Sequence, residues 1–315
     1  MSQNSQAVSK EFPFQADANT FSIANAYSLA QVSSLAYKHF EDNDQGNKDR
    51  TFFIEQVKAW GFSEYYFYDC HNIDDDAQGL ILADDEKIII AFRGTEVSAM
   101  QDVLTDLDLK QVRQFGGRVH RGFCTTFRSL WSSELRIWEG AEELVHKPGM
   151  KGTLEKLLNL KKRPLFVTGH SLGAAMAVLC SVACGEDLQV FQPMISLYDY
   201  GQPRVGDESF NETLHKYVKL IFRVVNNNDI VARIPVDISQ NSSVIDYKHT
   251  GKLIYLDTDQ KVHLEDLGWW QQKKDMLKGR LEDLGNLGTD GIKDHNLGDY
   301  ISILKGAFDN PQNIV

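Results

Sequence analysis

The chain has 315 residues, of which 42% are hydrophobic and 24% are charged, an ordinary composition for a globular protein with a sizeable core. With 33 Lys and Arg against 44 Asp and Glu, the formal charge is −11, which argues against general binding of nucleic acids or of anionic membranes through bulk charge. Four cysteines are too few for a disulfide framework in a domain of this size.

The start of the sequence bears on where the protein is located. Residues 1–20 are polar and lack the apolar core of a signal peptide, and no run of about 18 apolar residues occurs in the sequence. We therefore expect no integral membrane segment and, by default, a cytoplasmic protein. Export without a cleaved signal, or after removal of one, is the alternative.

The first third of the chain predicts helices followed by a group of strands. Apolar residues recur at helical spacing over 21–40, and a second, short helix is expected over 52–60 after a polar loop. Three runs of β type, at 65–68, 79–83 and 87–92, are separated by acidic turns. These runs predict an antiparallel meander that leads into the main sheet.

The segment that follows the third strand carries apolar side chains among acids. Residues 96–110 are a candidate lid, with an ordinary surface helix as the alternative reading. Apolar and aromatic residues at helical spacing then predict one helix over 125–144, and a shorter helix is expected over 152–160.

Residues 164–179 predict a strand, a sharp turn and a buried helix, and the turn is Gly169-His170-Ser171-Leu172-Gly173. A serine in such a turn has Oγ projecting above the sheet, while the glycines let strand and helix approach closely, which suits a nucleophile. The pattern G-x-S-x-G alone occurs by chance in about one chain of this length in ten. Its position between an apolar strand and a small-residue helix favours the functional interpretation.

The remaining part predicts strands over 190–200, 220–225 and 251–258, a helix over 210–218 and a C-terminal helix that ends near 308. Between them, residues 263–293 repeat apolar side chains at spacings of three and four. This segment is a candidate cap or insertion, with a packed surface helix or a dimer contact as alternatives. The absence of repeats and long linkers predicts a single domain over residues 1–315.

A serine nucleophile requires an imidazole base and a carboxylate that orients the base. In α/β-hydrolases these residues follow the order Ser, acid, His along the chain. We therefore prefer His295, at the start of the last helix, to His263. We prefer Asp229, which follows a buried strand and so lies at the strand's carboxyl end, to Asp199.

Six sequence blocks, in the right order, resemble the class 3 lipases, also called fungal-type triacylglycerol lipases. The blocks are residues 90–96, 119–123, 167–174, 200–206, 228–235, and Asp294-His295 with Tyr300. The resemblance implies an α/β-hydrolase fold with a mostly parallel central sheet, helices on both faces and a helical lid after the third strand. It implies hydrolysis of carboxylic esters of glycerolipids by Ser171, Asp229 and His295, with Thr95 and Leu172 as the oxyanion hole.

Two departures from the family pattern leave the substrate open. Val103 stands where a tryptophan is expected in the lid motif, and the 264–292 segment is longer than compact members need. A phospholipase A1 or a broad carboxylesterase is one alternative, and a catalytically silent module that binds lipid or a partner is another. The mechanism requires neither metal nor cofactor. The expected partner is a lipid or ester at a lipid–water interface, and the oligomeric state is open.

Overall fold

The computed structural model describes most of the chain. The described residues are 11–40, 43–72, 75–95, 109–132, 135–140, 142–227, 229–235, 238–240, 243–264 and 289–315.

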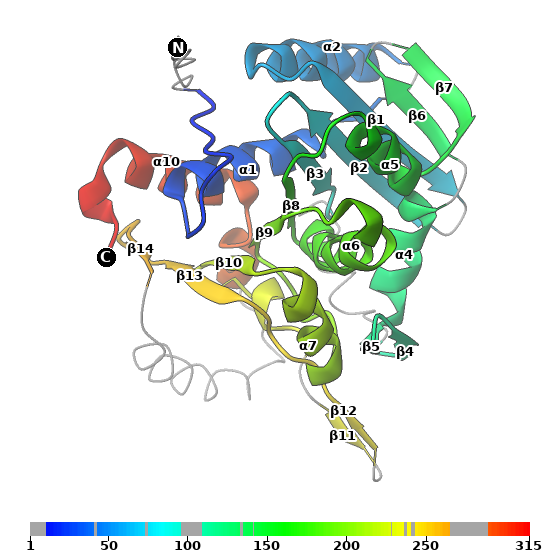
Figure 1. Cartoon of the computed structure of the whole chain (residues 1–315). Coiled ribbons are helices and arrows are strands. Elements are labelled where there is room, and N and C mark those ends of the chain that lie inside the picture. The colour runs from blue at the N-terminus through cyan, green and yellow to red at the C-terminus, as the bar shows by residue number, and fades with distance from the viewer. Residues whose placement is uncertain are drawn as a thin grey trace.

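A ten-stranded sheet runs through this part of the chain (Figure 1). Its strands lie in the order β14 (Val262–His263), β13 (Lys252–Leu256), β10 (Leu220–Asn226), β9 (Ile195–Tyr200), β8 (Leu165–His170), β3 (Ile88–Phe92), β2 (Asp75–Ala83), β1 (Glu64–Asn72), β6 (Leu135–Glu139) and β7 (Glu142–Lys147). The five strands from β13 to β3 are parallel, so their carboxyl ends meet at one edge. β1, β2 and β3 form the predicted antiparallel meander.

Helices cover both faces of the sheet (Figure 1). The helices on one face are α1 (Ile23–Leu35), α2 (Asp44–Ala59) and α10 (Leu297–Asp309). Those on the other face are α4 (Arg121–Trp131), α5 (Met150–Leu160), α6 (Leu172–Asp187) and α7 (Glu208–Tyr217). Alternate side chains of a strand point to opposite faces of a sheet. Ile89 and Ala91 of β3 therefore pack on the face covered by α1, α2 and α10, while Ile90 and Phe92 pack on the face covered by α4 to α7.

Several short elements complete the described chain. They are the hairpins β4 (Gln111–Gln114) with β5 (Gly117–His120) and β11 (Ile238–Gln240) with β12 (Ser243–Ile245), the helix α9 (Thr289–Lys293), and the 3-10 helices η2 (Gln189–Phe191), η3 (Val231–Arg233) and η4 (Pro311–Asn313).

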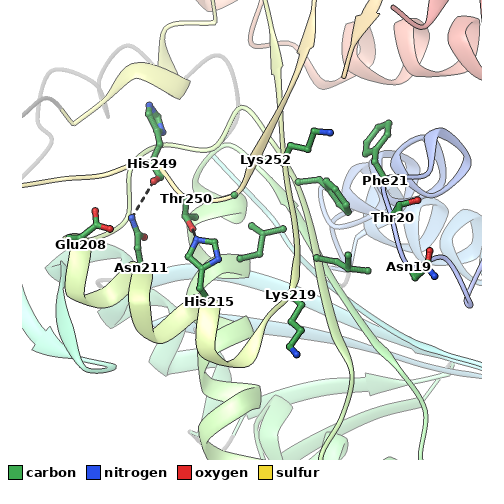
Figure 2. A pocket seen from close by; sticks show the side chains of 14 residues that line it. Asn19, Thr20, Phe21, Glu208, Asn211, His215, Lys219, His249, Thr250 and Lys252 are labelled. Atoms are coloured by element: carbon green, nitrogen blue, oxygen red, sulfur yellow. Dashed lines mark hydrogen bonds between the residues drawn. The ribbon is translucent and has the colours of Figure 1, made fainter. Parts of the chain in front are cut away.

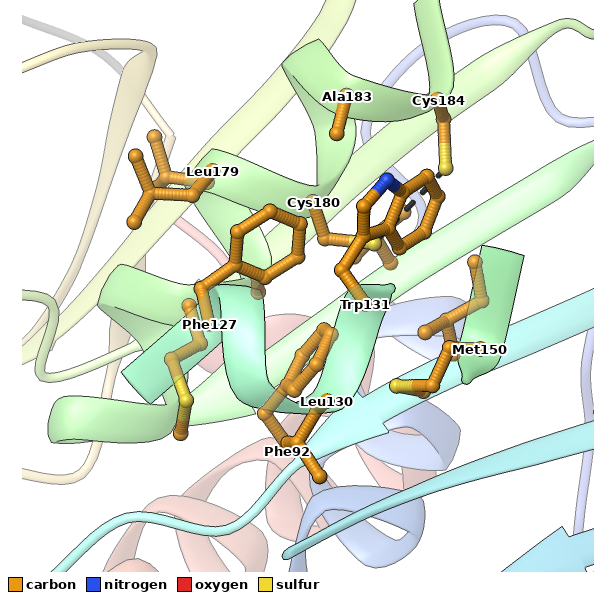
Figure 3. Close-up of a cluster of buried hydrophobic side chains, with 14 of the residues drawn as sticks. Phe92, Phe127, Leu130, Trp131, Met150, Leu179, Cys180, Ala183 and Cys184 are labelled. Carbon is orange, nitrogen blue, oxygen red and sulfur yellow. Dashed lines mark hydrogen bonds between the residues drawn. The ribbon is translucent and has the colours of Figure 1, made fainter. Parts of the chain in front are cut away.

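The core beneath α6 is closely packed (Figure 3). Every residue of α6 from Gly173 to Gly185 is buried, and its many small side chains let the helix lie directly on the sheet. Phe127 and Trp131 of α4 pack there with ring centroids 5.5 Å apart. The Sγ atoms of Cys180 and Cys184 are in contact at 3.8 Å. The structure describes all four cysteines; all are buried and none forms a disulfide.

The prediction of one helix over 125–144 is wrong. α4 ends at Trp131, and the chain then forms the β6–β7 hairpin at the edge of the sheet. Ile137 belongs to the core beneath α6, whereas the adjacent Trp138 packs on the other face against Phe40, with ring centroids 5.9 Å apart. The apolar residues beyond Leu135 therefore alternate as in a strand, although their spacing also fits a helix.

Two element boundaries also differ from the predictions. α2 begins at Asp44, within the segment predicted to be a polar loop, because the Asn43 side chain accepts a hydrogen bond from Gly46 N–H and caps the helix. β9 begins only at Ile195, because residues 189–191 form a 3-10 helix.

The candidate lid and the candidate cap lie largely outside the described residues. Of the lid, only 109–110 are described, and of the cap only 263–264 and 289–293, so both stay predictions; Val103 is also outside. Among the helices that the structure does describe, none combines the length and apolarity needed to cross a membrane.

Candidate active site

Ser171 lies in the tight turn between β8 and α6, as the sequence predicts. Its backbone has φ 61° and ψ −130°, a conformation that non-glycine residues rarely adopt. The Ser171 N–H donates to Tyr200 O (3.0 Å), and the Ser171 carbonyl accepts from Ala174 N–H (3.0 Å). The turn is therefore held by the neighbouring strand and by the helix that it opens.

The two glycines of the motif allow this turn to pack. A Cβ added to Gly169 would lie 2.3 Å from Gly173 O, and one added to Gly173 would lie 2.2 Å from Phe92 O. Both distances are far below any contact that a real Cβ makes. Strand β8, helix α6 and the end of β3 are thus in direct main-chain contact around the serine.

The loop after β3 lies against the serine. A Cβ added to Gly94 would lie 2.4 Å from His170 O and 2.9 Å from Ser171 Cβ. The next residue, Thr95, is therefore placed on the rim beside Ser171. Leu172 is the first residue of α6, so its N–H has no acceptor within the helix and points out of the helix N-terminus.

Asp229 and His295 form a fully buried pair. Asp229 Oδ1 accepts hydrogen bonds from Val231 N–H (2.9 Å) and Ala232 N–H (3.4 Å) at the start of η3. Asp229 Oδ2 accepts from His295 Nδ1 (2.8 Å) and from the Tyr300 hydroxyl (2.5 Å). Both side chains of the pair are 0% exposed. Each carboxylate oxygen is thus held by two donors.

These contacts determine the charge state of the carboxylate. Burial alone would raise the pKa of Asp229, but the His295 imidazole and the Tyr300 hydroxyl outweigh burial and hold that pKa below its ordinary value. Burial and the Asp229 carboxylate raise the pKa of Tyr300 well above its ordinary value. Tyr300 therefore keeps its proton and donates to Asp229, while its oxygen accepts from Asn226 N–H (3.0 Å).

The loop between α9 and α10 carries His295. Its N–H donates to Ile292 O (3.2 Å), and Asn226 Nδ2 donates to Asp294 O (2.9 Å). With Nδ1 bonded to Asp229, Nε2 is the nitrogen that can take a proton. Neither His295 Nε2 nor the buried Ser171 Oγ has a hydrogen-bond partner among the described residues. Within the described part of the chain, the Ser171 hydroxyl and His295 Nε2 are thus both available for hydrogen bonding.

The family model of class 3 lipases matches residues 89–238. The chain is thus similar to class 3 lipases over this span. It is 29% identical over 233 residues to triacylglycerol lipase OBL1 of Arabidopsis thaliana, covering 63% of this chain and 44% of that protein. It is 28% identical over 318 residues to toxin TseL of Vibrio cholerae, covering 76% of this chain and 45% of that protein. The chain thus spans less than half the length of either relative.

A solved structure shows the same fold. The crystal structure of a lipase from Rhizopus microsporus var. chinensis aligns with a TM-score of 0.54 at 20% identity, covering 81% of this chain and 80% of that one. The predicted α/β-hydrolase fold is therefore confirmed. The parallel strands at the centre of the sheet carry Ser171 and Asp229 at their carboxyl ends.

Gly201 brings the two halves of the site together. Its N–H donates to Val224 O (3.0 Å), and it follows Tyr200, whose carbonyl binds Ser171 N–H. Gly201 has φ +58°, and an added Cβ would lie 2.6 Å from Asp229 Oδ2 and 2.8 Å from His295 Nδ1. The Asp229 carboxylate and the His295 ring therefore pack directly against the main chain at Gly201.

Gly201→Ala is expected to lower kcat at least about tenfold, because the methyl group displaces the Asp229–His295 pair. It should also cost about 2–4 kcal/mol of unfolding free energy through backbone strain and overlap. Gly61→Ala is the matched control, since Gly61 also has positive φ (+89°) but an added Cβ meets no described atom within 4 Å. Denaturant unfolding and ester hydrolysis of both variants test this; equal effects of the two substitutions would contradict it.

The rival residues lie elsewhere. Asp199, on β9, pairs in register with Arg223 of β10, and burial raises its pKa well above the ordinary value despite the opposing effect of Arg223. His263 Nε2 bonds Asp257 Oδ2 (2.6 Å) on the β13–β14 side of the sheet. The structure thus brings Asp229 and His295 together and places Asp199 and His263 in other pairs.

Sequence reasoning missed three side chains that contact the site. Tyr300 and His170 belong to the sequence blocks named above, but their local sequence predicts neither the Tyr300 bond to Asp229 nor the His170 bond to His295. Tyr37 has no local signal, because it is 133 residues from its partner His170. In the part of the chain that the structure describes, no group of three His, Cys, Asp or Glu side chains is arranged to hold a metal ion.

A hollow of about 560 Å³ lies at the opposite edge of the sheet (Figure 2). Lys219 and Lys252, just before β10 and at the start of β13, line it together with His215 of α7, and Asn211 Nδ2 donates to His249 O (3.2 Å) nearby. The triad candidates follow the carboxyl ends of the strands, whereas this hollow lies at their amino ends. It is separate from the site.

Proposed function

We propose that this chain hydrolyses carboxylic ester bonds of glycerolipids through an acyl-enzyme on Ser171. The observation that carries the proposal is the buried Asp229–His295 pair, joined at 2.8 Å, next to a serine in a strained strand-to-helix turn. A protein that only binds lipid has no need of this set of groups.

The chemistry follows from the charges of the site. Ser171 Oγ attacks the ester carbonyl carbon while His295 Nε2 takes the hydroxyl proton, and the Asp229 carboxylate stabilises the resulting imidazolium. His295 then gives this proton to the leaving alcohol as the carbonyl re-forms. Water then enters, loses a proton to His295 and attacks the acyl carbonyl carbon; His295 returns this proton to Ser171 Oγ as the bond to Ser171 breaks and the fatty acid leaves.

The developing oxyanion needs donors that are already in place. The Leu172 N–H, at the N-terminus of α6, provides one donor together with the positive end of the helix dipole. Thr95 follows Gly94, which lies so close to Ser171 that an added Cβ would be 2.9 Å from Ser171 Cβ, and provides the second donor through its N–H.

Long-chain acylglycerols are the substrates that we propose. The Arabidopsis relative is named a triacylglycerol lipase, and the sequence places an apolar and acidic segment, 96–110, directly after Thr95. We propose that this segment acts as a lid and that activity rises at a lipid–water interface.

Hydrolysis of p-nitrophenyl esters from short to long acyl chains, with and without a triacylglycerol emulsion, tests this function. We expect turnover that favours long chains and rises on emulsified lipid, because the lid opens at the interface. Phospholipid vesicles in parallel separate a triacylglycerol lipase from a phospholipase A1.

The outcomes distinguish the alternatives, provided that Ser171→Ala is measured beside the wild type as the blank. Turnover limited to short, soluble esters would indicate a carboxylesterase. If the wild type and the blank are equally inactive on all substrates, the chain is a binding module and the proposal is wrong.

A further inference from the structure

We propose that His170 is a positioning residue that holds the base His295, and that the Tyr37 hydroxyl donates to the other ring nitrogen in the tautomer in which His170 does so. This inference rests on the proposed function and concerns the same site. Neither residue is proposed to touch the substrate.

His170 is 2% exposed and is held on both ring nitrogens. Its Nδ1 is 2.8 Å from the Tyr37 hydroxyl, and its Nε2 is 2.8 Å from His295 O. The rings of His170 and His295 also stack, with centroids 4.4 Å apart and planes at 29°. One side chain thus contacts both the backbone and the ring of the base.

These partners determine where the proton of His170 lies. A carbonyl oxygen only accepts hydrogen bonds, so His170 Nε2 must carry a hydrogen and donate to His295 O. Burial, and next the neighbouring His295, lower the pKa of His170 to about 3, although Asp229 acts in the opposite direction. The neutral ring therefore leaves Nδ1 without a hydrogen, and Nδ1 accepts from the Tyr37 O–H.

The neutral state matters because His295 becomes an imidazolium during catalysis. Among the described residues, the groups that face His170 are the His295 ring, the Tyr37 hydroxyl, the Tyr300 ring, whose centroid is 5.9 Å away, and, beyond His295, the Asp229 carboxylate. A second positive ring stacked at 4.4 Å would oppose the charge on His295. A neutral His170 instead provides a flat surface that fixes the plane of the base.

His295 is consequently held at separate points. Asp229 binds its Nδ1, His170 Nε2 binds its backbone oxygen, and the stacked His170 ring limits its tilt. The Tyr37 hydroxyl also lies close to the loop after β3 that contains Gly94 and Thr95, since a Cβ added to Gly94 would lie 2.6 Å from this hydroxyl. The two residues thus connect the base to the loop that carries Thr95.

Two substitutions separate the two hydrogen bonds of His170. His170→Gln retains an amide donor near the Nε2 position and can still bond His295 O, whereas His170→Asn retains only an acceptor near Nδ1 for Tyr37. We expect kcat on a soluble ester to fall less than about fivefold in the Gln variant and about tenfold to a hundredfold in the Asn variant. KM should change less than about twofold in both, because neither bond contacts substrate.

A merely structural role predicts a different pattern. It would lower Tm in both variants and leave kcat per folded molecule equal in the two, which would overturn the inference. The pH dependence of wild-type kcat/KM adds a second test: we expect an acid limb with a one-proton slope, because His170 stays neutral. A two-proton slope in the wild type that becomes one-proton in the Gln variant would also overturn it.

Failure of the inference can be told apart from failure of the proposed function. If Ser171→Ala is inactive and His170→Asn retains wild-type kcat, only the role of His170 is wrong. ¹⁵N NMR of histidine-labelled protein provides a readout without turnover, with His170 assigned by its loss in the Gln variant. A neutral Nε2–H tautomer that persists from pH 5 to 9 is expected, and an Nδ1–H tautomer or a titrating ring contradicts the inference.

Discussion

Ser171→Ala is expected to lower kcat by about 10⁴- to 10⁶-fold while leaving the protein folded. In the proposed mechanism this hydroxyl forms the acyl-enzyme, and Ser171 is the one residue between the end of β8 and the start of α6. Because Ser171 Oγ has no hydrogen-bond partner among the described residues, its removal breaks no bond there. Tm should therefore change by less than about 2 °C.

The measurement compares wild type and variant on the best ester of the series, with Tm and circular dichroism as controls for folding. Fluorophosphonate labelling adds a second readout, since it requires the nucleophile but no complete turnover. Ester turnover by Ser171→Ala at more than a tenth of the wild-type rate would remove Ser171 from its proposed role.

Asp229→Asn should lower kcat by about 10⁴-fold, because the amide forces His295 into the wrong tautomer. The amide oxygen must take the Oδ1 position, since Val231 N–H and Ala232 N–H can only donate there. The amide NH₂ then faces His295 Nδ1, which has to become an acceptor and move its proton to Nε2. A protonated Nε2 cannot take the proton of Ser171.

The matched control is Asp199→Asn, a buried carboxylate on the neighbouring strand that faces Arg223 instead of His295. It should retain kcat per folded molecule, whatever its effect on stability. An active Asp229→Asn together with an inactive Asp199→Asn would reassign the acid.

Asp229→Asn also gives a stability test with a defined sign. Folding lowers the pKa of Asp229, so the carboxylate contributes stability above the pKa that Asp229 has in the unfolded chain. This contribution is lost as the pH falls through its pKa in the folded protein. The destabilisation caused by Asp229→Asn, measured by denaturant unfolding, should thus be largest near neutral pH and shrink toward pH 3. A destabilisation that grows as the pH falls would contradict this assignment.

The parts of the site that sequence predicts are those with local requirements. The turn around Ser171 needs a strand, two glycines and a small-residue helix within a short stretch, and all of these are visible in the sequence. Asp229 and His295 could be selected because chain order and the ends of strands restrict the candidates. The hydrogen bonds of His170 could not be predicted, since its partners are 125 and 133 residues away.

The errors in the fold prediction have the same origin. The helix expected over 125–144 follows a correct apolar spacing as far as Trp131, but β6 forms because residues 136–139 pair with β1, which lies about 70 residues earlier. Periodicity over a few residues does not separate a strand from a helix, and pairing with a distant edge decides between them. The start of α2, in contrast, depends on the cap at Asn43, which is difficult to recognise in the sequence because the neighbouring residues are also polar.

The packing of α10 against α1 has a consequence for biosynthesis. Tyr27 of α1 stacks on Phe308 of α10 with ring centroids 6.1 Å apart, and α10 carries Tyr300, which binds Asp229. His295 and Tyr300 are thus translated long after Ser171. Until the ribosome has passed His295, the nascent chain lacks the base that we propose for Ser171. The proposed mechanism therefore predicts no ester hydrolysis until α10 has been made and can pack against α1.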